Sequence, residues 1–137
     1  MSPLPPGSTI GIIGGGQLGR MLSMAAAQLG YRCHIYAPEA SGPAADVSAK
    51  WIQGDYGDAV RLLAFGQDVS AVTFEFENID PAPLAPLADA KPVFPPLRAL
   101  EIGQDRTLGR GQQPCRSRSR DRADRYAVNP QDCPVRL

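Results

Sequence analysis

The sequence predicts an α/β fold in which an open parallel sheet carries helices on both faces. Short β-branched runs alternate with helical segments along residues 8–108. The first run, residues 10–13, leads through three glycines straight into a helical pattern. A later run ends in acidic residues, at the strand end where parallel sheets hold their ligands. A chain of 137 residues is long enough for one such domain.

The first predicted helix begins at a glycine-rich turn. Gly14, Gly16 and Gly19 have the G-x-G-x-x-G spacing. Without side chains, such a turn lets a phosphate approach the backbone N–H groups at a helix N-terminus, where the helix dipole favours an anion. The same spacing also serves close packing of a helix on a strand, so by itself it does not identify a ligand. The helix then carries an apolar stripe of Leu18, Met21, Leu22, Ala25, Ala26 and Leu29.

The next elements continue the alternation of strands and helices. Residues 32–36 form a strand that ends before Pro38, residues 44–49 a short helix, and residues 51–53 a third strand. Asp58 caps a helix over residues 59–65, which Gly66 ends. The apolar face of that helix is predicted to be Val60, Leu63 and Ala64.

The last predicted elements complete the sheet. Residues 71–78 begin as a buried strand, residues 81–88 form a short helix with Pro81 in its first turn, and residues 93–94 are a small strand. A helix follows through Ile102, and residues 104–107 are typical of the start of another. With right-handed crossovers, this order gives a Rossmann-like fold.

The ends of the chain differ from the domain at residues 8–108. Residues 1–7 are rich in proline and predict a flexible N-terminus. Residues 1–108 contain seven Lys or Arg and eleven Asp or Glu, a net charge of −4, whereas residues 109–137 contain seven Arg and three Asp, a net charge of +4. The second segment has no helical or strand periodicity, and we expect a disordered Arg-rich tail.

Two explanations of this tail stay open. It could bind nucleic acid, although Asp121 and Asp124 among the arginines weaken its positive field, and we do not expect such a partner. Alternatively, residues 109–137 are a non-native continuation read in a shifted frame, because arginine and proline are enriched when GC-rich coding DNA is misread.

Composition excludes several classes of protein. No run approaches the eighteen or so apolar residues that span a bilayer, and the N-terminus lacks the pattern of a secretory signal, so we expect a cytoplasmic protein. Cys33, Cys115 and Cys133 are widely spaced and have only His34 as a nitrogen partner, which supports neither a disulfide framework nor a zinc site. We therefore expect no metal-binding residue.

A second candidate site follows the fourth strand. Residues 75–78 are Glu-Phe-Glu-Asn, and they end a strand that should lie beside the glycine turn. A carboxylate there can accept two hydrogen bonds from a ribose diol. The alternative is that Glu75 and Glu77 are only a solvated strand end.

Three motifs in this order resemble the N-terminal domain of the PurK family. They are GGGQLGRM at residues 14–21, TFEFENI at residues 73–79 and QDR at residues 104–106. The family consists of ATP-grasp enzymes, the N5-carboxyaminoimidazole ribonucleotide synthases. The combination is far more specific than the glycine spacing, and it implies a pre-ATP-grasp domain at residues 8–108.

The resemblance implies an ATP-dependent ligase of de novo purine (IMP) biosynthesis. Such an enzyme carboxylates 5-aminoimidazole ribonucleotide with bicarbonate, using ATP and magnesium. The glycine turn would receive the 5′-phosphate, Glu75 would bind the ribose hydroxyls, and Arg106 would approach the ATP phosphates. The substrate-binding residues that it implies are Gly14, Gly15, Gly16, Gln17, Leu18, Glu75, Glu77 and Asn78.

Members of the family continue beyond the QDR motif with an ATP-grasp domain and a C-terminal domain, which this sequence lacks. We therefore expect no catalytic residue here, no tight binding of ATP or magnesium, and no activity from this chain alone. A face left uncovered by the absent domains would promote self-association. The family commonly forms dimers, so the expected partners include a homodimer and exclude a membrane.

The glycine spacing leaves one alternative function, a stand-alone dinucleotide (NAD(P))-binding Rossmann module. Glu39 follows the second strand, twenty residues after Gly19, where such folds hold an acidic residue for the ribose. Pro38 precedes it, and the other motifs match a different family, so this alternative ranks second.

Overall fold

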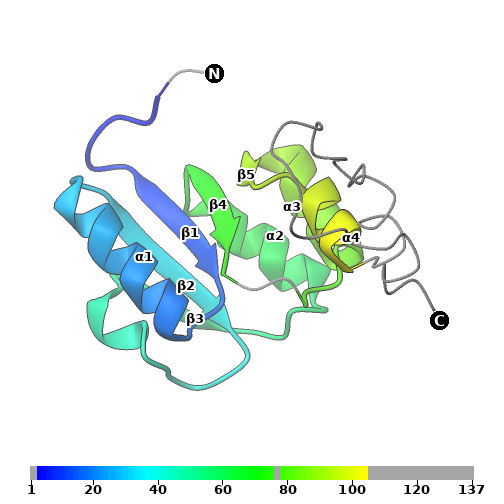
Figure 1. Cartoon of the computed structure of the whole chain (residues 1–137), viewed down its shortest axis with the longest axis horizontal. Helices are drawn as coiled ribbons and strands as arrows, with labels where there is room; N and C mark the ends of the chain where they lie inside the picture. Colours follow the sequence, from blue (N-terminus) through cyan, green and yellow to red (C-terminus); the bar gives the residue numbers. More distant parts are fainter. Residues whose placement is uncertain (1–2, 76–77, 105–137) are drawn as a thin grey trace, which may run out of the picture.

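The computed structural model describes residues 3–75 and 78–104, and it contains a five-stranded parallel sheet flanked by helices (Figure 1). The sheet has the order β3-β2-β1-β4-β5. Its strands are β1 (Thr9–Ile13), β2 (Arg32–Ala37), β3 (Lys50–Gln53), β4 (Ala71–Phe74) and β5 (Val93–Phe94). The predicted fold class, an open parallel α/β sheet, is confirmed.

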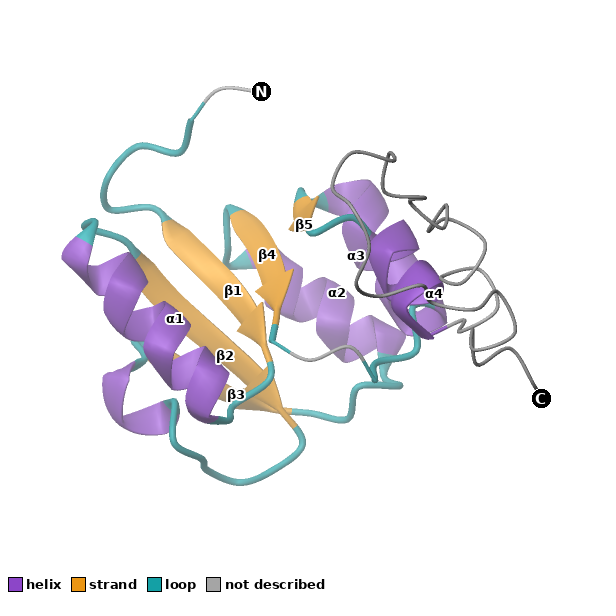
Figure 2. Cartoon of the chain, in the orientation of Figure 1, coloured by secondary structure: helices purple, strands orange, loops and turns teal. Residues whose placement is uncertain are grey.

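Helices follow most of the strands, as Figure 2 shows in purple around the orange sheet. They are α1 (Gln17–Gln28), α2 (Ala59–Gln67), α3 (Ala85–Ala90) and α4 (Leu97–Gln104), with two 3-10 turns, η1 (Ala45–Val47) and η2 (Ala82–Leu84). Within residues 3–75 and 78–104, no helix is long and apolar enough to cross a membrane.

The two faces of the sheet bury different residues, because successive side chains of a strand point to opposite sides. Ile13, Tyr36 and Val72 pack with α2, α3 and α4 in one cluster. Ile12 and Ile35 belong to a second cluster, on the side of α1. The sheet is therefore covered on both faces, as predicted.

Helix α1 buries a different part of its surface from the predicted stripe, of which Ala26 packs against the core. Its buried residues are Gly19 and Ser23, whereas Leu18, Met21 and Leu29 of the predicted stripe are exposed. A Cβ at Gly19 would come within 2.7 Å of the carbonyl oxygen of Gly14. Small residues thus allow α1 to lie close to the strand ends, while Leu22 and Leu29 line a cavity between the helix and the sheet.

The predicted face of α2 is also wrong. Leu62, Phe65 and Gly66 are buried, whereas Val60 is 79% exposed. Gly66 does not end the helix, which continues to Gln67. A glycine is needed at this position because a side chain there would collide with Leu87 of α3. The predicted cap is confirmed, since Asp58 Oδ1 accepts a hydrogen bond from the Arg61 N–H at 3.0 Å.

Two hydrogen bonds connect the N-terminal segment to the end of α1. The Gly7 N–H donates to the carbonyl of Gly30 at 2.7 Å, and the Tyr31 hydroxyl donates to the carbonyl of Leu4 at 2.9 Å. The predicted tail at residues 109–137 lies outside the described residues, as do Glu77 and Arg106.

Candidate functional site

The ends of β1 and β4 bring the two predicted motifs together. The strands pair in parallel with Ile13 opposite Phe74, and the Glu75 N–H donates to the carbonyl of Ile13 at 3.0 Å. Gly14 and Glu75 are therefore neighbours at the carboxyl edge of the sheet, where open α/β sheets bind ligands.

The carboxylate of Glu75 accepts hydrogen bonds from the glycine turn. Its Oε1 accepts from the Gly16 N–H at 3.0 Å, and its Oε2 accepts from the Gly19 N–H. Gly16 is the N-cap of α1 and offers no side chain of its own, so Glu75 caps the helix from a distant strand. The positive end of the helix dipole stabilises this carboxylate.

The glycines make room for Glu75. Gly14 has φ +115°, a conformation that side chains disfavour, and it lies directly against the Glu75 side chain. A Cβ at Gly16 would lie 2.7 Å from Glu75 Oε1, and a Cβ at Gly19 would lie 2.7 Å from Oε2. In this structure, the anion at the glycine turn is a carboxylate of the chain itself.

A cavity of about 340 Å³ opens beside Glu75. It lies at the carboxyl edge of the sheet, because its walls come from the segments that follow β1, β2, β3 and β4 and from Trp51 of β3. Two carboxylates and two aromatic rings stand out among its lining residues, which are Gly15, Gly16, Glu39, Ser41, Gly42, Pro43, Trp51, Tyr56 and Glu75.

The loop after β2 holds the glycine turn in place. The Ala44 N–H donates to the carbonyl of Gly15 at 3.2 Å, and Arg20 Nη1 donates to the carbonyl of Pro43 at 3.0 Å. Trp51 Nε1 donates to the carbonyl of Glu39 at 3.0 Å, and the indole lies against Gly15, where no side chain would fit. The loop after β2 and the indole of Trp51 thus both hold the glycine turn in position.

The cavity is electrostatically negative. Burial, together with the carboxylates of Glu39 and Glu75, raises the pKa of the Tyr56 phenol to about 12. Among the described residues that line the cavity there is no Lys, Arg or His. Such a site suits a ligand group that donates hydrogen bonds, such as a sugar hydroxyl, better than a phosphate.

The structure brings together only part of the predicted site. Gly15, Gly16 and Glu75 line the cavity, whereas Gln17 and Leu18 are exposed in the first turn of α1 and do not. Asn78 is exposed in the segment after β4 and is not among the lining residues either. Glu77 and Arg106 lie outside the described residues.

Sequence reasoning missed Trp51, Tyr56 and Ser41, and it assigned Glu39 only to the alternative function. Glu39 and Ser41 follow β2, Tyr56 follows β3, and Trp51 lies within β3. The rule that ligands bind beyond the carboxyl ends of strands points to the segments after β2 and β3, and so to Glu39, Ser41 and Tyr56, but it does not point to Trp51. Within residues 3–75 and 78–104, no group of three or more His, Cys, Asp or Glu could hold a metal ion.

Comparisons with known proteins identify the family of the domain. A family model described as the ribonucleotide synthetase preATP-grasp domain matches residues 7–104. An N5-carboxyaminoimidazole ribonucleotide synthase of Brucella melitensis is 50% identical over 103 residues, which cover 75% of this chain and 28% of the relative.

Two solved structures share the fold. The N5-carboxyaminoimidazole synthetase of Staphylococcus aureus complexed with ADP has a TM-score of 0.73 and 37% identity, over 77% of this chain and 28% of that chain. The synthase of Aspergillus clavatus in complex with ADP and 5-aminoimidazole ribonucleotide has a TM-score of 0.68 and 26% identity, over 77% of this chain and 28% of that chain. The chain spans less than a third of the length of each of these proteins.

Proposed function

Because this chain belongs to the PurK family, whose pre-ATP-grasp domain it contains, we propose that it binds the ribose of 5-aminoimidazole ribonucleotide through Glu75. The observation that supports this most is the position of the Glu75 carboxylate, which the amides of Gly16 and Gly19 hold at the edge of the cavity.

The chemistry of the carboxylate fits a ribose diol. Two carboxylate oxygens together offer about four acceptor sites. The two glycine amides use two of them, which leaves one on each oxygen for a hydroxyl donor. The 2′- and 3′-hydroxyls of a ribose are spaced to donate to both oxygens of one carboxylate. The helix dipole and the amides keep Glu75 in place for this contact.

The glycine turn then has a different role from the one first expected. The amides of Gly16 and Gly19 already hold a carboxylate, so a phosphate on the same amides would have to displace it. Only the amides of Gln17 and Leu18 remain at the start of α1. We propose that the glycines position Glu75 and that the 5′-phosphate points away from the two carboxylates of the cavity.

The rest of the reaction is proposed from the family. The full-length enzyme would carboxylate the amino group of 5-aminoimidazole ribonucleotide with bicarbonate, with ATP and magnesium supplying the phosphoryl transfer, in the cytoplasm. Residues 3–104 would contribute substrate binding, and Arg106, with Glu77 and Asn78, would complete the edge of the site. The chain alone, whose matched segment covers 28% of the Brucella melitensis relative, is expected to be inactive.

The dinucleotide alternative agrees with one observation and conflicts with two. Glu39 does line the cavity at the end of β2. However, Glu75 occupies the amides that would hold a pyrophosphate, and the Trp51 indole covers Gly15. We therefore prefer the ribonucleotide.

Thermal unfolding with added ligand tests the proposal. We expect 5-aminoimidazole ribonucleotide, or ribose 5-phosphate, to raise the Tm of the 137-residue chain because a ligand that binds the folded state stabilises it. The Glu75→Gln variant, which keeps the side-chain shape but loses an ionised acceptor, should lose the shift. Glu101→Gln, an exposed change on α4, is the matched control and should keep it.

Trp51 gives a second readout, because it is the sole tryptophan of the chain and lines the cavity. Ligand in the cavity should change its fluorescence. No response to either ribosyl ligand at millimolar concentration, together with a response to NAD(P), would overturn the proposal in favour of the alternative function.

A further inference from the structure

The loop after β2 forms one wall of the cavity beside Glu75. The lining residues that belong to this loop are Glu39, Ser41, Gly42 and Pro43. We call residues 38–44 the β2 loop. Strand β1 lies between β2 and β4 in the sheet, so the β2 loop and Glu75 border the cavity from different sides. The width of the cavity depends on where the loop stands relative to Glu75.

Strand β3 holds the beginning of the β2 loop. Gln53 Nε2 donates to the carbonyl of Pro38 at 3.0 Å, and Trp51 Nε1 donates to the carbonyl of Glu39 at 3.0 Å. The Trp51 indole also lies against Gly42, where an added Cβ would come within 3.0 Å of Cη2. The fluorescence of Trp51 should therefore report on the position of the loop.

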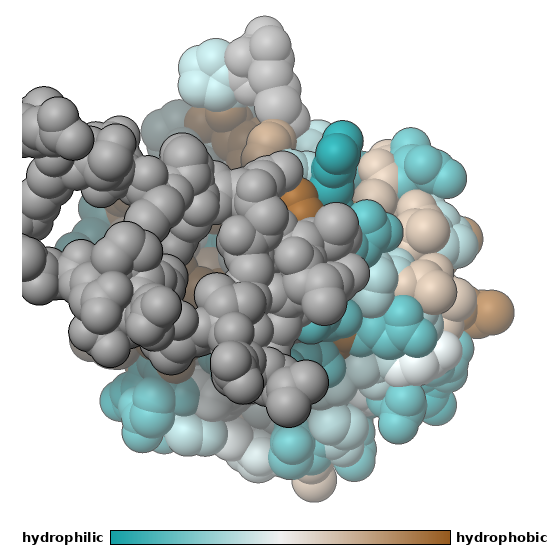
Figure 3. Space-filling view, turned by 45° about the vertical axis from the view of Figure 1, so that its right-hand side comes forward, coloured by the Kyte–Doolittle hydropathy of each residue, from teal (hydrophilic) through white to brown (hydrophobic). Residues whose placement is uncertain are grey.

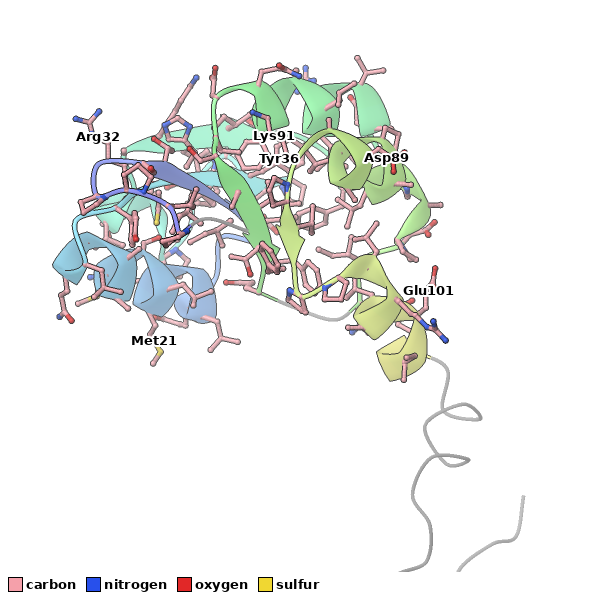
Figure 4. The ribbon with its side chains drawn as sticks, turned by 90° about the horizontal axis from the view of Figure 1, so that it is seen from above. Met21, Arg32, Tyr36, Asp89, Lys91 and Glu101 are labelled. Carbon is pink, nitrogen blue, oxygen red and sulfur yellow. The ribbon has the colours of Figure 1, made fainter. Side chains whose placement is uncertain are left out.

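Helix α1 holds the end of the β2 loop through Arg20. Arg20 Nη1 donates to the carbonyl of Pro43 at 3.0 Å and lies 3.3 Å from Asp46 Oδ2, in η1 just after the loop. Figure 1 shows η1 beside α1. Figure 4 shows Met21, the next residue of α1, pointing away from the rest of the molecule. The contact with the loop thus belongs to Arg20 and not to its neighbour.

The residue before Arg20 holds the other side of the cavity. The Gly19 N–H donates to Glu75 Oε2. Two consecutive residues of α1 therefore hold the Glu75 carboxylate and the β2 loop. Successive residues of an α-helix are fixed about 1.5 Å apart along its axis. Helix α1 can set the distance between the carboxylate and the loop as long as Arg20 is engaged.

We propose that Arg20 is a positioning residue of the ribose site, which fixes the β2 loop at the distance from Glu75 that a ribosyl ligand requires. The effect on the ligand rests on the function proposed above, whereas the effect on the loop does not. Arg20 does not line the cavity, and its cation is paired with Asp46, so it acts through geometry rather than charge. A loop that is already in place loses less conformational freedom when the ligand binds.

A second arginine provides a matched control. Hydrophilic residues predominate where the atoms in Figure 3 are not grey, and an exposed ion pair typically adds little stability. Arg61 of α2 makes the same two kinds of contact as Arg20. Its Nη1 donates to the carbonyl of Gln53 at 3.0 Å, and its Nε lies 3.6 Å from Asp58 Oδ2. Arg61 does not line the cavity beside Glu75 either.

Amide hydrogen exchange of the 137-residue chain tests the position of the loop without any ligand. The Ala44 N–H donates to the carbonyl of Gly15, next to the Arg20 contact. In Arg20→Gln, this amide should exchange about fivefold faster, as expected for the loss of one hydrogen bond, and the emission of Trp51 should shift. Arg61→Gln and Met21→Gln should change neither.

Fluorescence titration with 5-aminoimidazole ribonucleotide tests the consequence for binding. Arg20→Gln should raise the Kd about fivefold, whereas Arg61→Gln and Met21→Gln should leave it unchanged. Arg20→Lys keeps a cationic donor and should recover part of the loss in affinity. Far-ultraviolet circular dichroism and Tm establish that each variant is folded.

Unchanged Ala44 exchange and Trp51 emission in Arg20→Gln would overturn the proposal. So would a faster exchange with an unaltered Kd, and so would an equal loss of affinity in Arg61→Gln or Met21→Gln, because that effect would not be specific to the loop. If neither ribosyl ligand binds the unmodified chain, the proposed function fails, and hydrogen exchange still decides whether Arg20 fixes the loop.

Discussion

At the scale of single residues, the glycine turn is built around a carboxylate. The three glycines of the motif all lie against Glu75, and two of them donate N–H groups to it. Glu75 therefore acts as a helix cap and as the proposed ligand contact at once. The spacing of the glycines could be found in the sequence, but their partner could not, because Glu75 lies 59 residues after Gly16.

The Gly16→Ala variant tests this dependence. Gly16 has φ −80°, which alanine accepts, and the atoms that its new Cβ would meet all belong to Glu75. We expect the methyl group to displace the carboxylate from its amides and to lower the free energy of unfolding by about 1.5–3 kcal/mol, the range of hydrogen bonds to a charged group. Urea denaturation of the variant and of the unmodified chain measures this difference in the free energy of unfolding.

The Glu75→Ala background supplies the control for Gly16→Ala. Once the carboxylate is gone, the added methyl group has no neighbour to displace. The loss of unfolding free energy caused by Gly16→Ala should then fall to a few tenths of a kcal/mol. Equal costs in both backgrounds would show that Gly16 serves the backbone alone.

His34 predicts how stability depends on pH. Burial lowers the pKa of its imidazole, the Lys50 cation acts in the same direction, and Asp68 opposes them. The unfolded chain, with an ordinary histidine pKa of about 6.5, then binds a proton more readily than the folded chain. Stability should therefore be complete above about pH 6.5 and fall as the pH drops toward the lower pKa of the folded state.

Urea denaturation at a series of pH values measures this loss. The His34→Gln variant should show a flatter profile between about pH 7 and pH 5, because it removes the titrating group. Asp68 does not interfere in this window, since its hydrogen bond to Lys50 lowers the pKa of its carboxyl below the usual range. An unchanged profile in the variant would assign the acid sensitivity to another group.

At the scale of elements, strand and helix positions could be predicted, but helix faces could not. The observed strands and helices lie within a few residues of the expected ones, because β-branched runs, caps and prolines mark them locally. Which side of a helix is buried depends on what it packs against. Gly66 shows this: it resembles a helix stop in sequence, yet it lies inside α2 because Leu87 of α3 needs the space.

Helix α1 shows the same limit more strongly. Its large apolar residues indicated a core-facing stripe by their spacing. The sheet needed Gly19 and Ser23 instead, since the strand ends and the turn leave no room for larger side chains. Of the stripe that periodicity identified, Ala26 packs against the core, whereas Leu18, Met21 and Leu29 are exposed.

At the scale of the whole molecule, the topology explains why the site could be located but not completed. The order β3-β2-β1-β4-β5 places the ends of β1 and β4 side by side, which the sequence already predicted for the glycine turn and Glu75. Trp51 and Tyr56 line the same cavity from β3 and from the segment after it, although β2 separates β3 from β1 in the sheet. Their position in the cavity depends on side-chain packing, which cannot be predicted from the local sequence.

Binding without turnover is the prediction for the chain as a whole. Its described domain holds the proposed ribose contact, while the relatives are more than three times as long as the matched segment. Phosphoryl transfer needs cationic side chains and a metal arranged around the ATP phosphates, and the cavity beside Glu75 offers carboxylates instead. With 5-aminoimidazole ribonucleotide, bicarbonate, ATP and magnesium present, the 137-residue chain should release no ADP above background in a coupled assay, although the ribonucleotide raises its Tm. The Brucella melitensis relative, assayed in parallel, is the positive control for the reagents. ADP release that depends on the ribonucleotide and disappears in Glu75→Gln would show that the shorter chain is catalytic by itself, and the assignment of ATP chemistry to residues outside the domain would then be wrong.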